Sequence, residues 1–315
     1  MILITDITDC LGREILALLD KNDFKIPVKA IVNEKEAKNS FSVNLNTEFY
    51  EGSINDHPFL DKVLKNVDTI LVTDSNILFD KRMGYINLVN AARGNKVKRI
   101  IFISTVGPDH SECCIIRENR DTEKYIRQSG ITYNIVRVNI LMERLPFFIG
   151  DPIENKVIYY PAGSGRISFV SVKDIAEFLI RILMSPQEEN KEYSLSHNVS
   201  YSFGDIAEKL SQNYGKPIIY EHIDINLYRD ALLQTSLSEQ VIDRFCSVAK
   251  SIQNNEFDVT DGMLQSLLNP HNGKTIKQNV MDWFKRKDDS TLSLNYKLMT
   301  LPEFLSVNNW KAVDA

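Results

Sequence analysis

The sequence predicts an α/β fold with a doubly wound parallel sheet, followed by a small α+β C-terminal lobe. Three observations lead to this prediction. Short β-branched segments alternate with helical patterns over the first half of the chain. Several of these segments are apolar throughout, which is typical of parallel strands buried on both faces. The connections between the segments are short, as in βαβ units.

Six strands are expected in the first part of the chain, each followed by polar or turn-forming residues. They are expected at residues 2–4, 28–32, around 49–50, 69–73, 99–105 and 133–138. Helical periodicity is found between them, at residues 11–19, 59–64, 85–92 and 122–127. Because the crossovers of such a sheet are right-handed, the ligand site is expected at the carboxyl ends of the strands.

The regular alternation weakens after about residue 139. A short strand is expected at 193–195, and Ser202 with Asp205 has the spacing of a capping box before a helix that ends near Gly215. Further short elements are expected at 218–220, 228–233, 239–252 and 275–284.

We therefore expect three parts in the chain. They are a Rossmann-like domain at 1–150, a small substrate or partner lobe at 151–287 whose chain crosses back to the sheet, and a C-terminal extension at 288–315. A charged break at 285–289 precedes the extension. The extension is apolar enough to pack on the body or on a partner.

Charge, hydropathy and the cysteine and histidine content of the chain exclude several classes of function. The formal net charge of −5 and a pI of about 5.7 give no electrostatic footprint for nucleic acid or for an anionic membrane. No apolar run is long enough to span a bilayer, and the N-terminus lacks the layout of a signal peptide. The four cysteines have no zinc-type spacing and the five histidines are scattered. We expect a cytoplasmic protein with reduced thiols, no metal, no membrane contact and no direct contact with nucleic acid.

The first fifteen residues, MILITDITDCLGREI, read as a strand, a tight polar turn and a helix. This is the opening of a nucleotide-binding βαβ unit. The dinucleotide fingerprint of a Rossmann-type fold requires glycine at three positions in the turn. In register, these positions are Asp6, Asp9 and Gly12, so the glycine motif is degenerate and only its third member is present.

Several further segments resemble the NmrA-like branch of the atypical short-chain dehydrogenase/reductases, which includes quinone reductases and dinucleotide-sensing regulators. The most distinctive segment reads PAGSGRISFV and is followed by Asp-Ile-Ala at 174–176. The resemblance spans about residues 1–285, and its segments are 87–92, 97–100, 122–133, 138–143, 161–170 and 174–176. It implies a Rossmann domain that binds NADP or NAD and a small C-terminal substrate lobe.

The turn departs from the family pattern, which reads roughly TGATGxxG. Those glycines let the backbone approach the pyrophosphate. One aspartate about 4 Å from a phosphate charge costs roughly 4 kcal/mol near a protein surface. Two acids in the turn, Asp6 and Asp9, are therefore expected to remove useful dinucleotide binding. For Asp9 a harmless alternative is equally open, since aspartate tolerates turns and can cap the following helix.

Other positions depart from the family in the same direction. Asn33 stands where relatives that prefer the phosphorylated dinucleotide often carry arginine, and Ser53 stands where relatives carry an aspartate that faces the adenine. No Tyr-x-x-x-Lys pair follows the fifth strand. Asn119 lies near the place of the lysine used by isoflavone-reductase-like relatives.

A small-molecule site is expected between the carboxyl edge of the sheet and the C-terminal lobe. No catalytic residue is identified, and the candidates are Glu123, Glu143 and Asn119. Either glutamate can act as an acid or base if burial raises its pKa, but a salt-bridged carboxylate is the simpler reading. The residues expected at a cofactor site are Thr5, Asp6, Asp9, Leu11, Gly12, Asn33, Ser53, Thr73 and Ser104. The residues expected at the substrate pocket are Thr105, Asn139, Met142, Phe147, Phe148 and Tyr160.

The departures favour a protein that has lost the use of a nicotinamide cofactor and needs no cofactor. It would bind a small molecule, either as a cofactor-independent biosynthetic enzyme of the isomerase or cyclase type or as a regulator or scaffold. The alternative is an NAD(P)H-dependent oxidoreductase that reduces a quinone or a conjugated carbonyl. A homodimer or a protein partner is expected at the C-terminal extension.

Overall fold

A seven-stranded parallel sheet forms the centre of the computed structural model, which describes residues 1–21, 25–32, 46–73, 80–185, 190–269 and 296–307. The strand order is β3-β2-β1-β4-β5-β6-β9, and each neighbouring pair is parallel. The strands are β1 (Ile2–Ile4), β2 (Val28–Val32), β3 (Thr47–Glu51), β4 (Thr69–Val72), β5 (Arg99–Thr105), β6 (Thr132–Val138) and β9 (Lys191–Leu195). The predicted Rossmann-type fold is confirmed.

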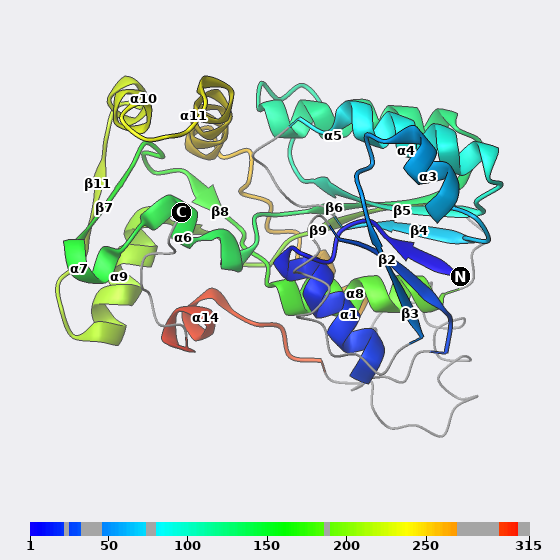
Figure 1. Ribbon diagram of the computed structural model, residues 1–315. Helices are drawn as coiled ribbons and strands as arrows, with labels where there is room; N and C mark the ends of the chain where they lie inside the picture. The colour runs from blue at the N-terminus through cyan, green and yellow to red at the C-terminus, as the bar shows by residue number, and fades with distance from the viewer. Residues whose placement is uncertain (22–24, 33–45, 74–79, 186–189, 270–295, 308–315) are drawn as a thin grey trace.

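Helices cover both faces of this sheet (Figure 1). One face is covered by α3 (His57–Val63), α4 (Arg82–Gly94) and α5 (Cys114–Gln128). The other face is covered by α1 (Cys10–Lys21) and α8 (Val172–Met184), which also pack against each other.

The helices on both faces of the sheet explain why its strands are apolar along their whole length. In β1, the side chain of Leu3 joins the core beneath α3 and α4, whereas Ile2 and Ile4 join the core beneath α1 and α8. Side chains of a strand alternate between the two faces of a sheet, so a strand that is buried on both faces is apolar at every position.

The second lobe lies beyond the end of β6 and is built from short elements (Figure 1). It contains a parallel pair of strands, an antiparallel pair and several helices. The expected capping box is present, since the Ser202 side chain accepts from the Asp205 N–H and the Asp205 side chain accepts from the Ser202 N–H; Gly215 ends that helix in the left-handed conformation. The elements are η1 (Met142–Arg144), α6 (Pro146–Ile149), α7 (Pro152–Asn155), β7 (Val157–Tyr160), β8 (Arg166–Ile167), β10 (Tyr201–Ser202), α9 (Phe203–Tyr214), β11 (Ile219–His222), α10 (Ile225–Leu233) and α11 (Glu239–Gln253). The helix that follows, α12 (Met263–Leu268), packs on the Rossmann domain instead, against α8 and β9.

The chain passes between the two lobes more than once. After β7 and β8 it returns to cover the sheet with α8 and to add β9 at the sheet edge. The described part of the C-terminal extension, residues 296–307, also packs on the body. Leu298 belongs to the core under α1 and α8, and Leu301 and Leu305 of α14 (Leu301–Val307) belong to the core of the second lobe.

Some expectations about the ends of the chain stay predictions. The helix at 275–284 and the charged break at 285–289 lie outside the described residues, as does most of the extension. A homodimer or protein partner at the extension also stays a prediction. None of the helices in the described part of the chain combines the length and the apolar character that crossing a membrane requires.

Candidate functional site

The turn between β1 and α1 is fixed to the neighbouring strand β4. The Thr73 hydroxyl donates to the Asp6 carbonyl oxygen at 2.5 Å, and it accepts from the Asp6 N–H at 3.1 Å. The Thr73 N–H donates to the Thr5 hydroxyl at 3.3 Å. Thr5 and Thr73 therefore hold the turn at the carboxyl edge of the sheet, where a ligand site of this fold is expected.

Gly12 allows the first turn of α1 to pack directly on this loop. A Cβ atom at position 12 would lie 2.0 Å from the Asp6 carbonyl oxygen and 2.8 Å from the Ile7 Cα atom. No side chain fits at such distances. Of the three glycine positions in the fingerprint, the one occupied by glycine is the one that sets close packing between helix and strand.

The Asp6 side chain is turned back onto its own loop. Its Oδ1 atom accepts from the Thr8 N–H at 2.7 Å and from the Thr8 hydroxyl at 2.5 Å. The residue is 6% exposed. An aspartate that bonds to the backbone two residues further on stabilises a turn. The carboxylate of Asp6 is therefore engaged within the loop.

The Asp9 carboxylate is engaged at the start of α1. Its Oδ1 atom accepts from the Cys10 N–H at 2.8 Å and from a terminal nitrogen of Arg144 at 2.5 Å. Arg144 is the last residue of η1, which follows β6, so this ion pair joins the first turn to the entry of the second lobe. The pairing neutralises the charge of Asp9.

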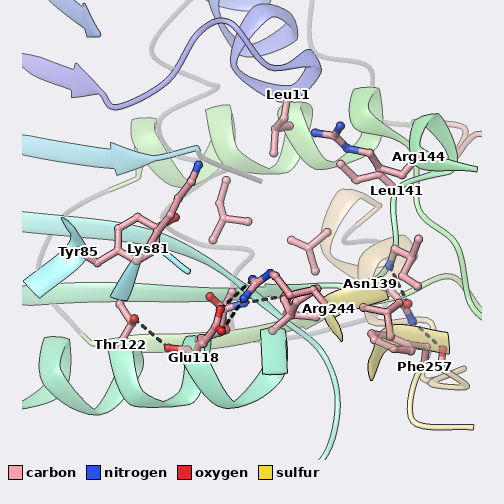
Figure 2. Close-up of a pocket in the computed structure, with 18 of the residues that line it drawn as sticks. Leu11, Lys81, Tyr85, Glu118, Thr122, Asn139, Leu141, Arg144, Arg244 and Phe257 are labelled. Carbon is pink, nitrogen blue, oxygen red and sulfur yellow. Dashed lines mark hydrogen bonds and ion pairs between the residues drawn. The ribbon is translucent and has the colours of Figure 1, made fainter. Parts of the chain in front are cut away.

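A pocket lies next to this turn, between the carboxyl edge of the sheet and the second lobe (Figure 2). It encloses about 1000 Å³ of space, including open solvent at its mouth. Leu11 and Arg144 form one rim, below the start of α1, and Glu118 of α5 lies on the opposite side beside Arg244 of α11. The apolar wall consists of Leu11, Tyr85, Ile103, Ile115, Val138, Ile140, Leu141, Phe148, Val248 and Phe257. The polar wall consists of Lys81, Arg82, Ser104, Thr105, Glu118, Asn119, Thr122, Asn139, Arg144 and Arg244.

Polar contacts order the wall of the pocket. Arg244 donates to both carboxylate oxygens of Glu118, at 2.6 and 2.9 Å. Asn119 donates to the Thr105 hydroxyl at 2.8 Å, which ties α5 to the end of β5. Asn139 donates to the Phe257 carbonyl oxygen at 3.0 Å and so fixes the second lobe to the end of β6. The walls are therefore set before any ligand arrives.

The structure brings together eleven of the eighteen residues that the sequence places at a site. Six of them line the pocket: Leu11, Ser104, Thr105, Asn119, Asn139 and Phe148. Five others build the adjacent turn: Thr5, Asp6, Asp9, Gly12 and Thr73.

Four of the remaining residues do not line the pocket. Met142 and Tyr160 are buried in the core of the second lobe, and Phe147 is 48% exposed. Ser53 lies in an exposed turn after β3, where its hydroxyl accepts from the Asn55 N–H. Asn33 lies outside the described residues.

Glu123 is held as a buried carboxylate by three arginines. It is 0% exposed, and it accepts from Arg120 at 2.8 Å, from Arg127 at 2.9 Å and from Arg137 at 2.6 Å. Burial alone raises its pKa, but hydrogen bonds from Arg137 and Ser104 and the nearby arginine charges outweigh burial, so the pKa of this carboxyl lies below its usual value. An ionised, fully paired carboxylate is suited to holding β5, β6 and α5 together. Its arrangement does not favour proton transfer.

Glu143 caps the N-terminus of α8. Its two carboxylate oxygens accept from the Val172 N–H at 3.1 and 3.0 Å. Burial raises the pKa of Glu143 to about 7, and the neighbouring Asp174 and Glu14 add to this, while hydrogen bonds from backbone N–H groups lower it. This pKa suits an acid or base, but Glu143 is not among the residues that line the pocket. Its role as a catalytic residue stays a prediction.

No metal site is formed by the described residues. Within that part of the chain, no three histidine, cysteine, aspartate or glutamate side chains converge in a way that would hold an ion. Cys113 is the buried residue before α5, and Cys114 is the first residue of that helix. Burial raises the pKa of Cys114, which disfavours a reactive thiolate.

Sequence reasoning missed Arg144 and Arg244. Arg144 contacts a residue 135 positions away in the sequence, and Arg244 contacts one 126 positions away. No local sequence pattern predicts contacts between residues so far apart in the chain. For Arg144 the available signal was its place between Met142 and Phe147, two residues expected at the substrate pocket; for Arg244 the sequence analysis offered no such signal.

A protein-family model and several known proteins are similar to this chain. The model of the NmrA-like family matches residues 1–305. An NAD(P)H azoreductase from Xenophilus azovorans is 25% identical over 245 residues, which is 77% of this chain and 84% of the azoreductase.

Two solved structures share the fold. An NADPH-dependent quinone oxidoreductase from Escherichia coli, crystallised with NADPH, superposes with a TM-score of 0.78 at 23% identity, covering 90% of this chain and 100% of the other. NmrA, a negative transcriptional regulator crystallised with NAD, superposes with a TM-score of 0.69 at 15% identity and covers 97% and 94% of the two chains.

These findings contradict the expectation that no nicotinamide cofactor is used. The relatives by sequence include an NAD(P)H-dependent enzyme, and the structural neighbours were crystallised with NADPH or NAD. The expectation was wrong because it placed two bare carboxylates against the phosphates. In the structure Asp6 bonds to Thr8 within its own loop, and Asp9 forms an ion pair with Arg144, so one of the two charge penalties that motivated the expectation is removed.

Proposed function

This chain belongs to the NmrA-like family, and we propose that it is an NAD(P)H-dependent oxidoreductase that reduces a quinone or another conjugated carbonyl. The family match and the NAD(P)H-dependent relatives support this function. The observation that carries the proposal is the position of the pocket. It runs from the start of α1, along the ends of β5 and β6, to the second lobe.

The residues present fit a dinucleotide at this position. The first N–H groups of an α-helix have no partners within the helix, and its N-terminus attracts phosphate. Leu11 and Gly12 lie in that first turn, and Leu11 borders the pocket. The lining holds four basic residues, Lys81, Arg82, Arg144 and Arg244, and one acidic residue, Glu118, which suits an anionic ligand.

A bound nicotinamide supplies the hydride for the reduction. The protein orients the cofactor and the acceptor and excludes water from one side of them. Three buried apolar residues of the pocket lining form this side, Ile103, Val138 and Phe148. A flat, apolar acceptor can pack against such a wall, and the few polar groups beside it fix its orientation. The Arg244–Glu118 ion pair holds α11 against α5 and so keeps the second lobe over the reacting groups.

The proposal is tested by binding and turnover on the full chain. Calorimetric titration with NADPH and with NADH is expected to give a dissociation constant in the micromolar range, about −8 kcal/mol. Oxidation of NADPH is expected to require an added quinone. Absence of binding contradicts the proposal. Tight binding without turnover on quinones, enones or azo dyes also contradicts it and favours a dinucleotide-sensing regulator.

A variant pair locates the acceptor. Ile115→Trp places a large ring in the lining of the pocket, whereas Ile153→Trp makes the same change at a half-buried position of the second lobe that is not in the lining. Ile115→Trp is expected to raise KM for the quinone at least tenfold and to leave the dissociation constant of NADPH within about threefold. Equal KM values for the two variants would place the acceptor elsewhere.

A further inference from the structure

We propose that Arg144 binds the pyrophosphate of the dinucleotide, and that Asp9 is the resident anion that this pyrophosphate replaces. The inference rests on the proposed function and goes beyond it. It assigns the phosphate contact to a side chain from η1, which lies against the β1–α1 turn, where two of the usual glycines are absent.

The geometry points to this role first through the position of Arg144. The residue borders the pocket together with Leu11, and both lie at the rim formed by the start of α1 (Figure 2). Its side chain is 23% exposed, and that of its partner Asp9 is 11% exposed. The ion pair is therefore partly shielded from solvent, which strengthens the interaction compared with a surface pair.

Two contacts of the Asp9 carboxylate are those that a phosphate oxygen would make. Its Oδ1 atom accepts from a backbone N–H at the helix start, that of Cys10, and from the guanidinium of Arg144. Helix N-termini and arginine are the two donors that most often hold phosphate in proteins. One carboxylate oxygen thus marks a position where both donors converge on negative charge.

Replacement of the Asp9 carboxylate by the pyrophosphate at Arg144 is favourable in charge and in shape. Asp9 and Arg144 together are neutral, so the pair removes one of the two penalties that acids in the turn would impose. A pyrophosphate carries more negative charge than one carboxylate and offers several oxygens to the planar fork of a guanidinium. Arg144 can therefore exchange its contact with Asp9 for a bidentate contact with the ligand. Asp9 then competes with the ligand for Arg144.

Because Asp9 and the pyrophosphate compete for Arg144, substitutions of Asp9 and of Arg144 should change the affinity for NADPH in opposite directions. Arg144→Met is expected to weaken binding of NADPH ten- to a hundredfold, because it removes the contact and takes the balancing charge away from Asp9. Asp9→Asn is expected to tighten binding severalfold, because it frees the guanidinium and removes a charge. ADP-ribose, which carries the pyrophosphate without nicotinamide, is expected to show the same changes. Binding is measured by calorimetry at two salt concentrations.

The double variant separates direct contact from simple neutralisation. If Arg144 contacts the pyrophosphate, Asp9→Asn with Arg144→Met binds at least tenfold more weakly than Asp9→Asn alone, and its affinity falls less steeply with salt. If Arg144 only neutralises Asp9, these two proteins bind equally, and the inference is overturned. Arg166→Met, a half-exposed arginine of the second lobe paired with Asp205, is the matched control and should bind as the wild type does.

The remaining outcomes are also decisive. If both single variants weaken binding and lower the melting temperature alike, the pair is only a structural contact and the inference fails. If the wild type binds neither NADPH nor ADP-ribose, the proposed function fails together with it. If the wild type binds both and Arg144→Met binds equally well, only the assignment of Arg144 is overturned.

Discussion

Arg244 on α11 and Glu118 on α5 form a two-point ion pair that joins the second lobe to the Rossmann domain beside the pocket, with N–O distances of 2.6 and 2.9 Å. The two side chains are only 12% and 15% exposed. The pair is therefore a lobe contact that is largely withdrawn from water, and it shapes the same wall that a substrate would meet.

Breaking this pair should cost both stability and substrate affinity. Arg244→Met leaves the Glu118 carboxylate without its arginine in a shielded wall, which costs about 2–5 kcal/mol in comparable interfaces. Urea denaturation measures the loss. Arg229→Met, which removes a half-exposed arginine paired with Asp243 in the same lobe, should cost clearly less. Equal losses would show that the Arg244 pair has no special role.

Removal of the buried carboxylate at Glu123 should be more damaging. Glu123→Gln leaves three arginines without their shared counter-charge, and breaking a buried ion pair costs about 3–5 kcal/mol. Glu192→Gln, which contacts Arg127 and Arg137 from a position 34% exposed, is the control and should cost about 1 kcal/mol or less.

The pH dependence of the Glu123 effect follows from its lowered pKa. A carboxyl with a lower pKa in the folded state stabilises the fold above its unfolded pKa, and this contribution is lost as the pH falls through the folded value. The stability difference between wild type and Glu123→Gln should therefore narrow below about pH 4.5. A difference that stays constant on acidification would contradict the ionised state of this residue.

Glu143 should show the opposite dependence on pH. Its pKa is raised to about 7 in the folded protein, so the stabilising contribution of the protonated form is present below the unfolded pKa of about 4.5 and is lost as the pH rises to 7. Glu143→Gln cannot ionise but can still accept from the Val172 N–H. Its melting temperature relative to wild type should increase between pH 5 and pH 8. A flat difference across this range would argue against the raised pKa.

Two glycine substitutions should have opposite signs. Gly12→Ala forces a Cβ atom against the Asp6 carbonyl oxygen, and overpacking of this kind costs about 1–3 kcal/mol or more. Gly94→Ala, at the end of α4 where a Cβ atom meets nothing within 4 Å, should stabilise the protein by about 0.4–1 kcal/mol. Chemical denaturation of both variants checks the prediction, and destabilisation by Gly94→Ala would contradict it.

The C-terminal helix should contribute to the stability of the whole protein. Leu305→Ala removes a side chain that is 0% exposed and leaves a cavity in the core of the second lobe, at a cost of about 2–5 kcal/mol. Val307→Ala, on the same helix but 73% exposed, should change stability by less than about 0.5 kcal/mol. Similar effects from both would mean that α14 is loosely attached.

The sheet was predictable because each strand can be recognised from its own few residues. Strands such as β4 and β5 are short apolar runs whose burial on both faces demands that composition. The capping box at Ser202 and Asp205 is also local, and it was predicted correctly. The Asp6 turn could have been recognised too, since aspartate followed two residues later by threonine is a common turn motif.

The start of α5 could not be read from the sequence in the same way. The helix was expected at 122–127 and begins at Cys114. Its first turns contain β-branched residues and no side-chain cap. They are held instead by α11, through Ser247, which accepts from the Cys114 N–H, and through Arg244 on Glu118. Tertiary contacts thus override a weak local preference.

The same reason explains what was missed at the candidate site. The charge of Asp9 is balanced by Arg144, and the wall at Glu118 depends on Arg244; each partner lies more than a hundred residues away in the sequence. Without these partners, the acids in the turn suggested electrostatic repulsion of a phosphate. With them, the same acids are compatible with a dinucleotide.

The segment at residues 296–307 places Leu298 in one hydrophobic core and Leu301 and Leu305 in the other. Heat or urea that loosens this segment therefore opens both cores at once. We expect the two lobes to melt in a single cooperative transition, so that neither persists as a folded fragment after the other has been lost.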